Sequence, residues 1–137
     1  MAVASAVQPG TVQSSSRVHQ AYQAMHLILT VAPIVAGVDK FTHFLVNWDQ
    51  YVAPQIAAFL PFSAHTFMWI VGAIEIVAGV GVLLMPRVFA YVVSAWLVGI
   101  VANLVIGGQY LDVALRDLGL AVGAFSLGRM SEEVAEK

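Results

Sequence analysis

Ionisable side chains are scarce in this sequence, and those inside apolar segments are the first candidates for chemistry. The 137 residues include only six lysines and arginines and eight aspartates and glutamates. Glu75 is the single charge of the apolar segment 67–85. Gly72 and Gly79 share its helical face, so another helix can approach there. A carboxylate in such a place must pair with a cation, handle protons or bind the polar part of a ligand.

Each apolar segment carries a polar group at a comparable depth. With a helical rise of about 1.5 Å per residue, Glu75 lies about 12 Å and Arg116 about 9 Å from the outer ends of their helices. We therefore predict an ion pair between Glu75 and Arg116. The predicted buried polar cluster comprises Asp39, Lys40, Glu75, Asn103, Arg116 and Asp117. Two interpretations remain open: a network that fixes the helix register, or a site for protons or a quinone headgroup.

Histidines and aromatic residues form a second set of candidates. His19 and His26 lie two helical turns apart, about 10.5 Å, which is too far to share a metal ion, so no metal site is predicted. A haem bound by His26 would need a second histidine on a facing helix, whereas His43 and His65 fall in a loop; haem is not expected. The predicted contacts to a quinone or a lipid are His26, His43, Trp48 and Tyr51.

Several classes of function are excluded by composition and by the absence of motifs. No GxSxG, HExxH, P-loop or GxGxxG motif occurs, so a stand-alone enzyme is not expected. The chain has no cysteine, which rules out disulfides, a cysteine nucleophile and thiolate-bound metal or iron–sulfur clusters. A net charge of −2 and a pI near 6.0 give no electrostatic basis for binding nucleic acid.

The elements that position these residues follow from the composition. Hydrophobic residues make up 60% of the chain and charged residues 10%, against about 25% charged in an average soluble domain. Four apolar segments, residues 21–38, 67–85, 88–106 and 109–128, approach the length of about 20 residues needed to span a bilayer. They do not alternate as barrel strands do. The sequence predicts an all-α fold, an integral membrane four-helix transmembrane bundle.

The remaining segments are assigned by their composition. Residues 1–18 are small and polar and are predicted to be a flexible tail; the transmembrane domain covers residues 19–130, and a short tail covers 131–137. Between the first two spans, residues 41–66 are rich in aromatics, interrupted by Pro54 and Pro61. We expect this segment to lie in the interfacial region and cap the bundle. The alternative is a lid over a lipid-soluble ligand, with His43, Trp48 and Tyr51 lining its entry.

The positive charges predict an orientation. Arg17, Arg87, Arg129 and Lys137 fall on one side of the four-span arrangement, while Lys40 and Arg116 fall on or near the other. The positive-inside rule places the richer side, and both termini, in the cytoplasm. The loop 41–66 then faces outward.

Residues 25–130 resemble the DoxX-like family of small four-helix bacterial membrane proteins. The resemblance rests on Gly37-Val38-Asp39-Lys40-Phe41, on GAIEIVAGVGVLLMP in the second span and on Arg116-Asp117 at the start of the fourth. It implies location in the bacterial inner membrane and a link to respiratory or sulfur-oxidising systems such as thiosulfate:quinone oxidoreductase. Position by position, it points at Lys40, Glu75 and Asp117.

The expected function is that of an integral-membrane accessory subunit of a redox complex, which anchors or assembles partners and contributes to a quinone site. Its expected partners are the lipid bilayer and other membrane or peripheral redox subunits; an oligomer remains open. Beyond a quinone, no cofactor is predicted. Two alternatives remain, a proton-linked carrier that uses Glu75 and a purely structural membrane subunit.

Overall fold

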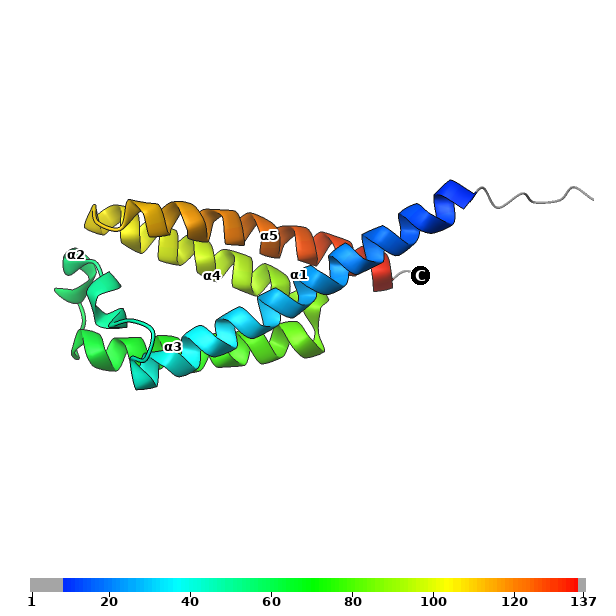
Figure 1. Cartoon of the computed structure of the whole chain (residues 1–137). Helices are drawn as coiled ribbons and strands as arrows, with labels where there is room; N and C mark the ends of the chain where they lie inside the picture. The colour runs from blue at the N-terminus through cyan, green and yellow to red at the C-terminus, as the bar shows by residue number, and fades with distance from the viewer. Residues whose placement is uncertain (1–8, 136–137) are drawn as a thin grey trace, which may run out of the picture.

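The computed structural model describes residues 9–135, and this part of the chain is helical with no strand (Figure 1). The prediction of an all-α fold is therefore confirmed for these residues. The elements in chain order are α1 (Pro9–Thr42), the 3₁₀ helix η1 (Trp48–Tyr51), α2 (Pro54–Ala57), α3 (Ala64–Leu84), α4 (Pro86–Gly107) and α5 (Leu111–Ala135).

Local sequence signals set most helix boundaries. The Ser63 side chain caps α3 by accepting a hydrogen bond from the backbone N–H of Thr66, which satisfies a donor that has no partner in the first turn. Pro86 occupies the first position of α4, where the hydrogen bonds of α4 itself do not need its missing N–H. Gly108 ends α4 with a left-handed φ of 68°, a conformation that glycine adopts without a steric penalty.

Both chain ends are more helical than the sequence indicated. α1 already begins at Pro9, within the tail predicted over residues 1–18, and α5 continues to Ala135, within the tail predicted over 131–137. Once a helix is nucleated, each further residue adds a hydrogen bond at little cost, so polar residues extend it readily. Residues 1–8 and 136–137 lie outside the described part.

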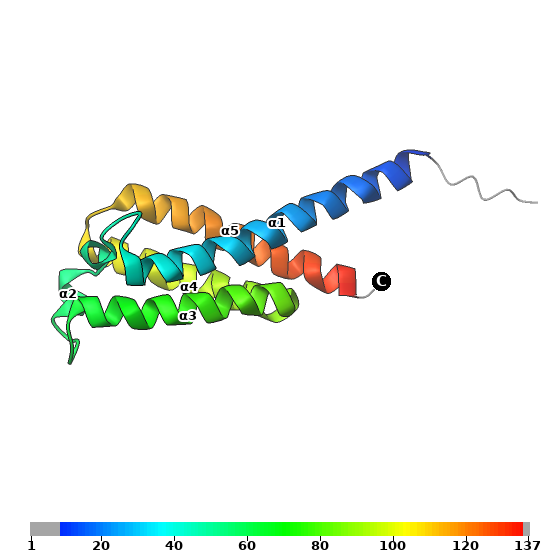
Figure 2. The same cartoon turned by 60° about the horizontal axis from the view of Figure 1, so that its bottom comes forward.

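The four long helices form two antiparallel pairs. α1 packs along α3 and α4 packs along α5, with weaker contacts between α3 and α4 and between α1 and α5. η1 and α2 lie at one end, here called the loop end, and both described chain ends lie toward the opposite end (Figures 1 and 2). The chain between α1 and α3 therefore covers the loop end of both pairs.

Glycine allows the close approach of α1 and α3. A Cβ atom on Gly72 would lie 2.7 Å from the carbonyl oxygen of Gly37, and one on Gly79 would lie 2.5 Å from Cγ1 of Ile34. Both distances are far inside van der Waals contact. The prediction that the Gly72 and Gly79 face receives another helix is confirmed, and that helix is α1.

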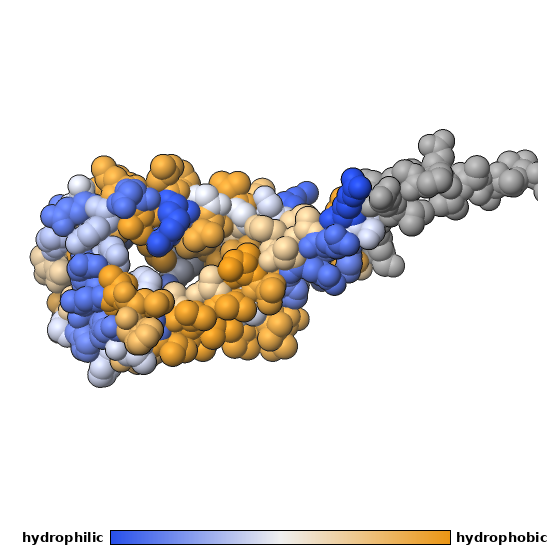
Figure 3. Space-filling view, in the orientation of Figure 1, coloured by the Kyte–Doolittle hydropathy of each residue, from blue (hydrophilic) through white to orange (hydrophobic). Residues whose placement is uncertain are grey.

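Within the described residues 9–135, three helices are long and apolar enough to cross a membrane: Ser16–Thr42 within α1, Ala64–Leu84 and Pro86–Gly107. Large hydrophobic side chains are exposed on their outer faces, where Figure 3 shows broad apolar surface. Exposed apolar area of this extent suits lipid contact rather than water. The chain thus fits a multi-pass membrane protein. α5 is not among the three.

Candidate functional site

A buried ion pair joins α1 to α3 near the loop end. Lys40 Nζ donates to Glu75 Oε2 at 2.7 Å, and the two side chains are only 4% and 9% exposed. The prediction that Glu75 pairs with Arg116 is wrong. The glycine contact explains the choice, because Gly37 and Gly72 each lie one turn before a member of the pair and bring the two backbones together.

Arg116 instead pairs with its neighbour in sequence. Its guanidinium lies 3.0 Å from the Asp117 carboxylate; the Arg116 side chain is 61% exposed and that of Asp117 only 8%. Asp117 lies close enough to Glu75 for its negative charge to act on that carboxylate. The structure thus brings Lys40, Glu75 and Asp117 into one neighbourhood and leaves Arg116 at its surface.

Trp48 covers the ion pair. Lys40 Nζ lies 3.7 Å from the centroid of the Trp48 ring, within the range of a cation–π interaction. The indole Nε1–H of Trp48 donates to Asp39 Oδ2 at 2.7 Å. Two adjacent residues of α1 therefore hold this indole: Asp39 accepts from its N–H, and the Lys40 ammonium lies over its face.

Asp39 also organises the turn that leaves α1. Its Oδ1 accepts hydrogen bonds from the backbone N–H groups of Phe44 at 2.9 Å and Leu45 at 3.0 Å, and from the hydroxyl of Thr42 at 3.1 Å. The turn needs this support because His43 has a left-handed φ of 52°, which is uncommon for residues other than glycine. Asp39 is thus a positioning residue for the loop.

Asn103 attaches the loop to α4 rather than joining the ion pair. Its Oδ1 accepts from the backbone N–H of Ala53 at 3.0 Å, and its Nδ2 donates to the carbonyl of Tyr51 at 2.7 Å. Tyr51 packs against Trp48, with ring centroids 5.9 Å apart, and edge-on against Tyr110 at 4.8 Å. These hydrogen bonds and ring contacts hold the aromatic residues in place at the loop end.

His26 lies elsewhere. Its Nε2 donates to the backbone carbonyl of Val82 at 2.8 Å, near the end of α3 that is remote from the loop. In a regular helix that carbonyl would accept from the N–H four residues later, but residue 86 is a proline and has none. His26 therefore caps a carbonyl that the sequence leaves without its helical donor, and the structure does not group it with His43, Trp48 and Tyr51.

The indole of Trp96 supplies an additional polar group near the pair. It packs in the same cluster as Trp48, and its buried Nε1–H lies within reach of the Glu75 carboxylate, although it forms no well-aligned hydrogen bond within the described part of the chain. Figure 3 shows the surface hollowed between the two helix pairs toward the loop end.

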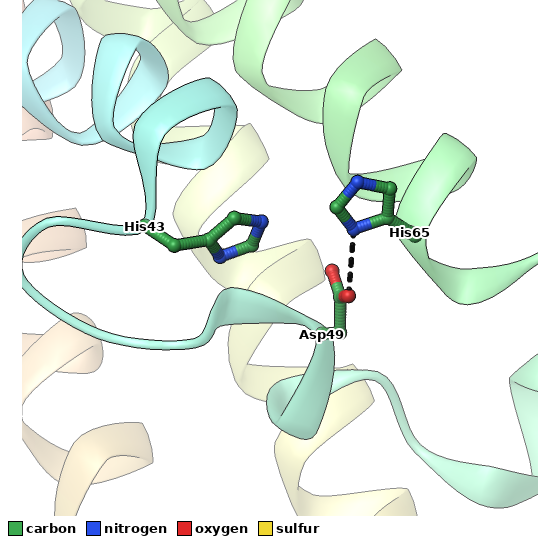
Figure 4. Close-up of side chains that lie close together, drawn as sticks. All are labelled: His43, Asp49 and His65. Carbon is green, nitrogen blue, oxygen red and sulfur yellow. Dashed lines mark hydrogen bonds and ion pairs between the residues drawn. The ribbon is translucent and has the colours of Figure 1, made fainter.

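The structure brings together His43, Asp49 and His65, which the sequence pattern does not group (Figure 4). They come from the turn after α1, from η1 and from the first turn of α3. The sequence signal was weak: two histidines near the ends of one loop, with an aspartate between them. Only the packing of η1 against α3 places the three side chains at one point.

Comparison with known proteins returns no match to a family model, to a curated protein or to a solved structure.

Proposed function

We propose that this protein is an integral-membrane accessory subunit of a redox complex in the bacterial inner membrane, and that its loop end contributes to a quinone site. The observation that carries the proposal is the buried Lys40–Glu75 pair beneath Trp48. Ionisable groups buried in membrane-spanning helices are costly and mark ligand or proton sites.

The chemistry of this neighbourhood suits a quinone headgroup. The headgroup is flat and accepts hydrogen bonds through two carbonyl oxygens, and it takes up protons when it is reduced. Lys40 Nζ and Trp96 Nε1 are hydrogen-bond donors, and the carboxylates of Glu75 and Asp117 are groups that can carry protons. Trp48 provides an aromatic face. The isoprenoid tail of a quinone would follow the apolar outer surface into the bilayer.

The role of an accessory subunit is supported by the composition: with no cysteine, the chain cannot hold an iron–sulfur cluster through thiolates. In this proposal the electrons come from a partner subunit, while this protein supplies the membrane anchor and part of the quinone pocket. The resemblance to the DoxX-like family supports the same proposal.

The proposal includes α5 as a fourth span, with both termini in the cytoplasm. Five large apolar side chains form an exposed stripe along α5 at alternating spacings of four and three residues. They are 46–72% exposed and comprise Leu111, Leu115, Leu118, Val122 and Phe125. Such a stripe is typical of one helix face, and lipid is the environment that accommodates it. The charged start of α5 is partly neutralised by the Arg116–Asp117 pair.

Quinone binding can be tested on the purified full chain in mild detergent. A short-chain ubiquinone should quench tryptophan fluorescence in a saturable manner, and Trp48→Phe and Glu75→Gln should weaken binding about tenfold or more, the loss of one buried polar or aromatic contact. Trp69→Phe is the matched control, because Trp69 is 45% exposed. If the parent and the three variants all bind the quinone equally, the quinone site is overturned. If the protein is isolated from native membranes without redox partners, the proton-linked carrier is favoured instead.

A second candidate, a purely structural membrane subunit, is favoured by the way Lys40 and Glu75 satisfy each other. The double variant Lys40→Met with Glu75→Gln separates the two candidates. If the host complex keeps normal quinone turnover with this subunit stably incorporated, the pair serves packing alone. Loss of turnover from an intact complex would instead assign the pair to the quinone site.

A further inference from the structure

The three side chains at the loop end belong to chain segments that meet only in the folded protein. His65 Nδ1 lies 2.8 Å from Asp49 Oδ2, and the His43 and His65 rings stack with centroids 5.2 Å apart. One ligand atom from each residue falls within 4.8 Å of the others. Figure 4 shows the Asp49 carboxylate below the two histidine rings, with the dashed line joining it to His65.

Their polar atoms are incompletely satisfied by the protein. Both ring nitrogens of His43 and the Oδ1 atom of Asp49 are buried without a hydrogen-bond partner in the described part of the chain. Buried polar groups normally have partners, and a neutral imidazole always carries one N–H donor and one acceptor nitrogen. One nitrogen of His43 and Oδ1 of Asp49 are therefore free to bind a shared cation together with the His65 ring.

From this geometry we propose that His43, Asp49 and His65 bind one divalent transition-metal ion of the kind that prefers imidazole, such as Zn²⁺. Two imidazoles and one carboxylate form a set that such ions bind, with bonds of about 2.0–2.2 Å. These bonds place ligand atoms of a tetrahedral ion about 3.3 Å apart. To reach this distance, His65 Nδ1 and Asp49 Oδ2 move slightly apart, and the His43 ring moves toward them.

The His43 ring forms no hydrogen bond within the described part of the chain, so rotation about its side-chain torsions breaks none. The ion has an entry path, because the His65 side chain is 46% exposed and that of Asp49 is 27% exposed. Three protein ligands leave a fourth position for water or for a ligand from a partner.

A bound ion would fasten the loop to both neighbouring helices. His43 follows α1, Asp49 lies in η1 beside Trp48, and His65 begins α3. The metal site is independent of the quinone proposal, because none of its three ligands contacts the Lys40–Glu75 pair through a hydrogen bond or an ion pair.

The test is calorimetric titration of the metal-free full chain in detergent with Zn²⁺ alone, alongside Mg²⁺, which prefers oxygen ligands. We expect one Zn²⁺ per chain, no comparable heat from Mg²⁺, and a thermal midpoint that rises with Zn²⁺ and returns after chelation. His65→Ala and Asp49→Asn should each weaken Zn²⁺ binding by at least about tenfold, the loss seen when even an outer partner of a ligand is removed.

His19→Ala is the matched control, because His19 is an exposed histidine of α1 that hydrogen-bonds to Gln23. It should bind Zn²⁺ as the parent does. X-ray absorption at the zinc edge should report nitrogen and oxygen ligands only. The proposal is overturned if His65→Ala, which removes a half-exposed ring and leaves the core intact, binds Zn²⁺ like the parent. It is equally overturned if His19→Ala loses binding to the same extent or if Mg²⁺ competes with Zn²⁺.

Discussion

Lys40 and Glu75 show how a charge is accommodated in an apolar helix pair. Each ion alone would be costly to bury, and removal of one member leaves the other uncompensated. The ammonium has three partners here: the Glu75 carboxylate at 2.7 Å, the backbone carbonyl of Ala36 at 3.5 Å and the Trp48 ring at 3.7 Å. The pair therefore connects three elements: α1, α3 and η1.

Glu75→Gln should destabilise the protein by about 3 kcal/mol or more, because it leaves the Lys40 ammonium buried without a counter-ion. Lys40→Met should have a similar effect through the carboxylate. The double variant should recover much of the loss, since no charge then remains. Chemical unfolding in detergent measures all three, with Arg129→Gln as an exposed control. Additive effects of the two substitutions would contradict the pairing.

Asp39→Ala should loosen the loop while the helices stay intact. The substitution removes the acceptor for two backbone N–H groups and for the Trp48 indole, so amide hydrogen exchange at Phe44 and Leu45 should accelerate. Amides within α4 should remain protected. Asp112→Ala, at an exposed aspartate of α5, should leave exchange in the loop unchanged. Unaltered exchange in Asp39→Ala would show that other contacts hold the turn.

At the level of elements, α1 and α3 can approach so closely only because glycine, which has no side chain, lies at the contact. Gly72→Ala would bring a Cβ to 2.7 Å from the backbone carbonyl of Gly37, which cannot move without displacing α1. We expect a loss of about 1–3 kcal/mol, typical of overpacking. Gly119→Ala is the control, because nothing lies within 4 Å of its Cβ position and alanine favours helices by up to about 1 kcal/mol. Equal stability of the two variants would contradict the close contact.

The sequence predicts the four long helices. It does not predict how each helix is rotated about its own axis, and that rotation decides which side chains meet. Apolar length and Pro86 located the helices, and the glycines around Glu75 identified a contact face. Depth along a helix, however, does not define its rotation, so Arg116 was matched to Glu75 although it points to the surface. The cluster of His43, Asp49 and His65 could not be predicted from the sequence for a related reason: the ends of a loop meet only through tertiary packing.

For the whole molecule, the lack of native cysteine allows topology to be tested with single cysteines and a membrane-impermeant maleimide. In the four-span arrangement, Phe59→Cys should react from outside intact cells, because Phe59 is 89% exposed in the loop. Glu133→Cys should react only after the membrane is opened. Val122→Cys, on the exposed stripe of α5, should resist labelling on both sides because lipid surrounds it. Ready labelling of Val122→Cys would remove α5 from the membrane.

The Lys40–Glu75 pair also constrains how the protein is made. The two residues are 35 positions apart in the chain, so Lys40 is synthesised well before its counter-ion Glu75. If α1 entered the bilayer alone, it would carry a cation with no partner in an apolar environment, which is unfavourable. Delayed lateral release of α1, until α3 has been synthesised and the two can leave the translocon as a hairpin, avoids that state. The glycine contact that closes this hairpin is thus as relevant to biogenesis as to the finished fold.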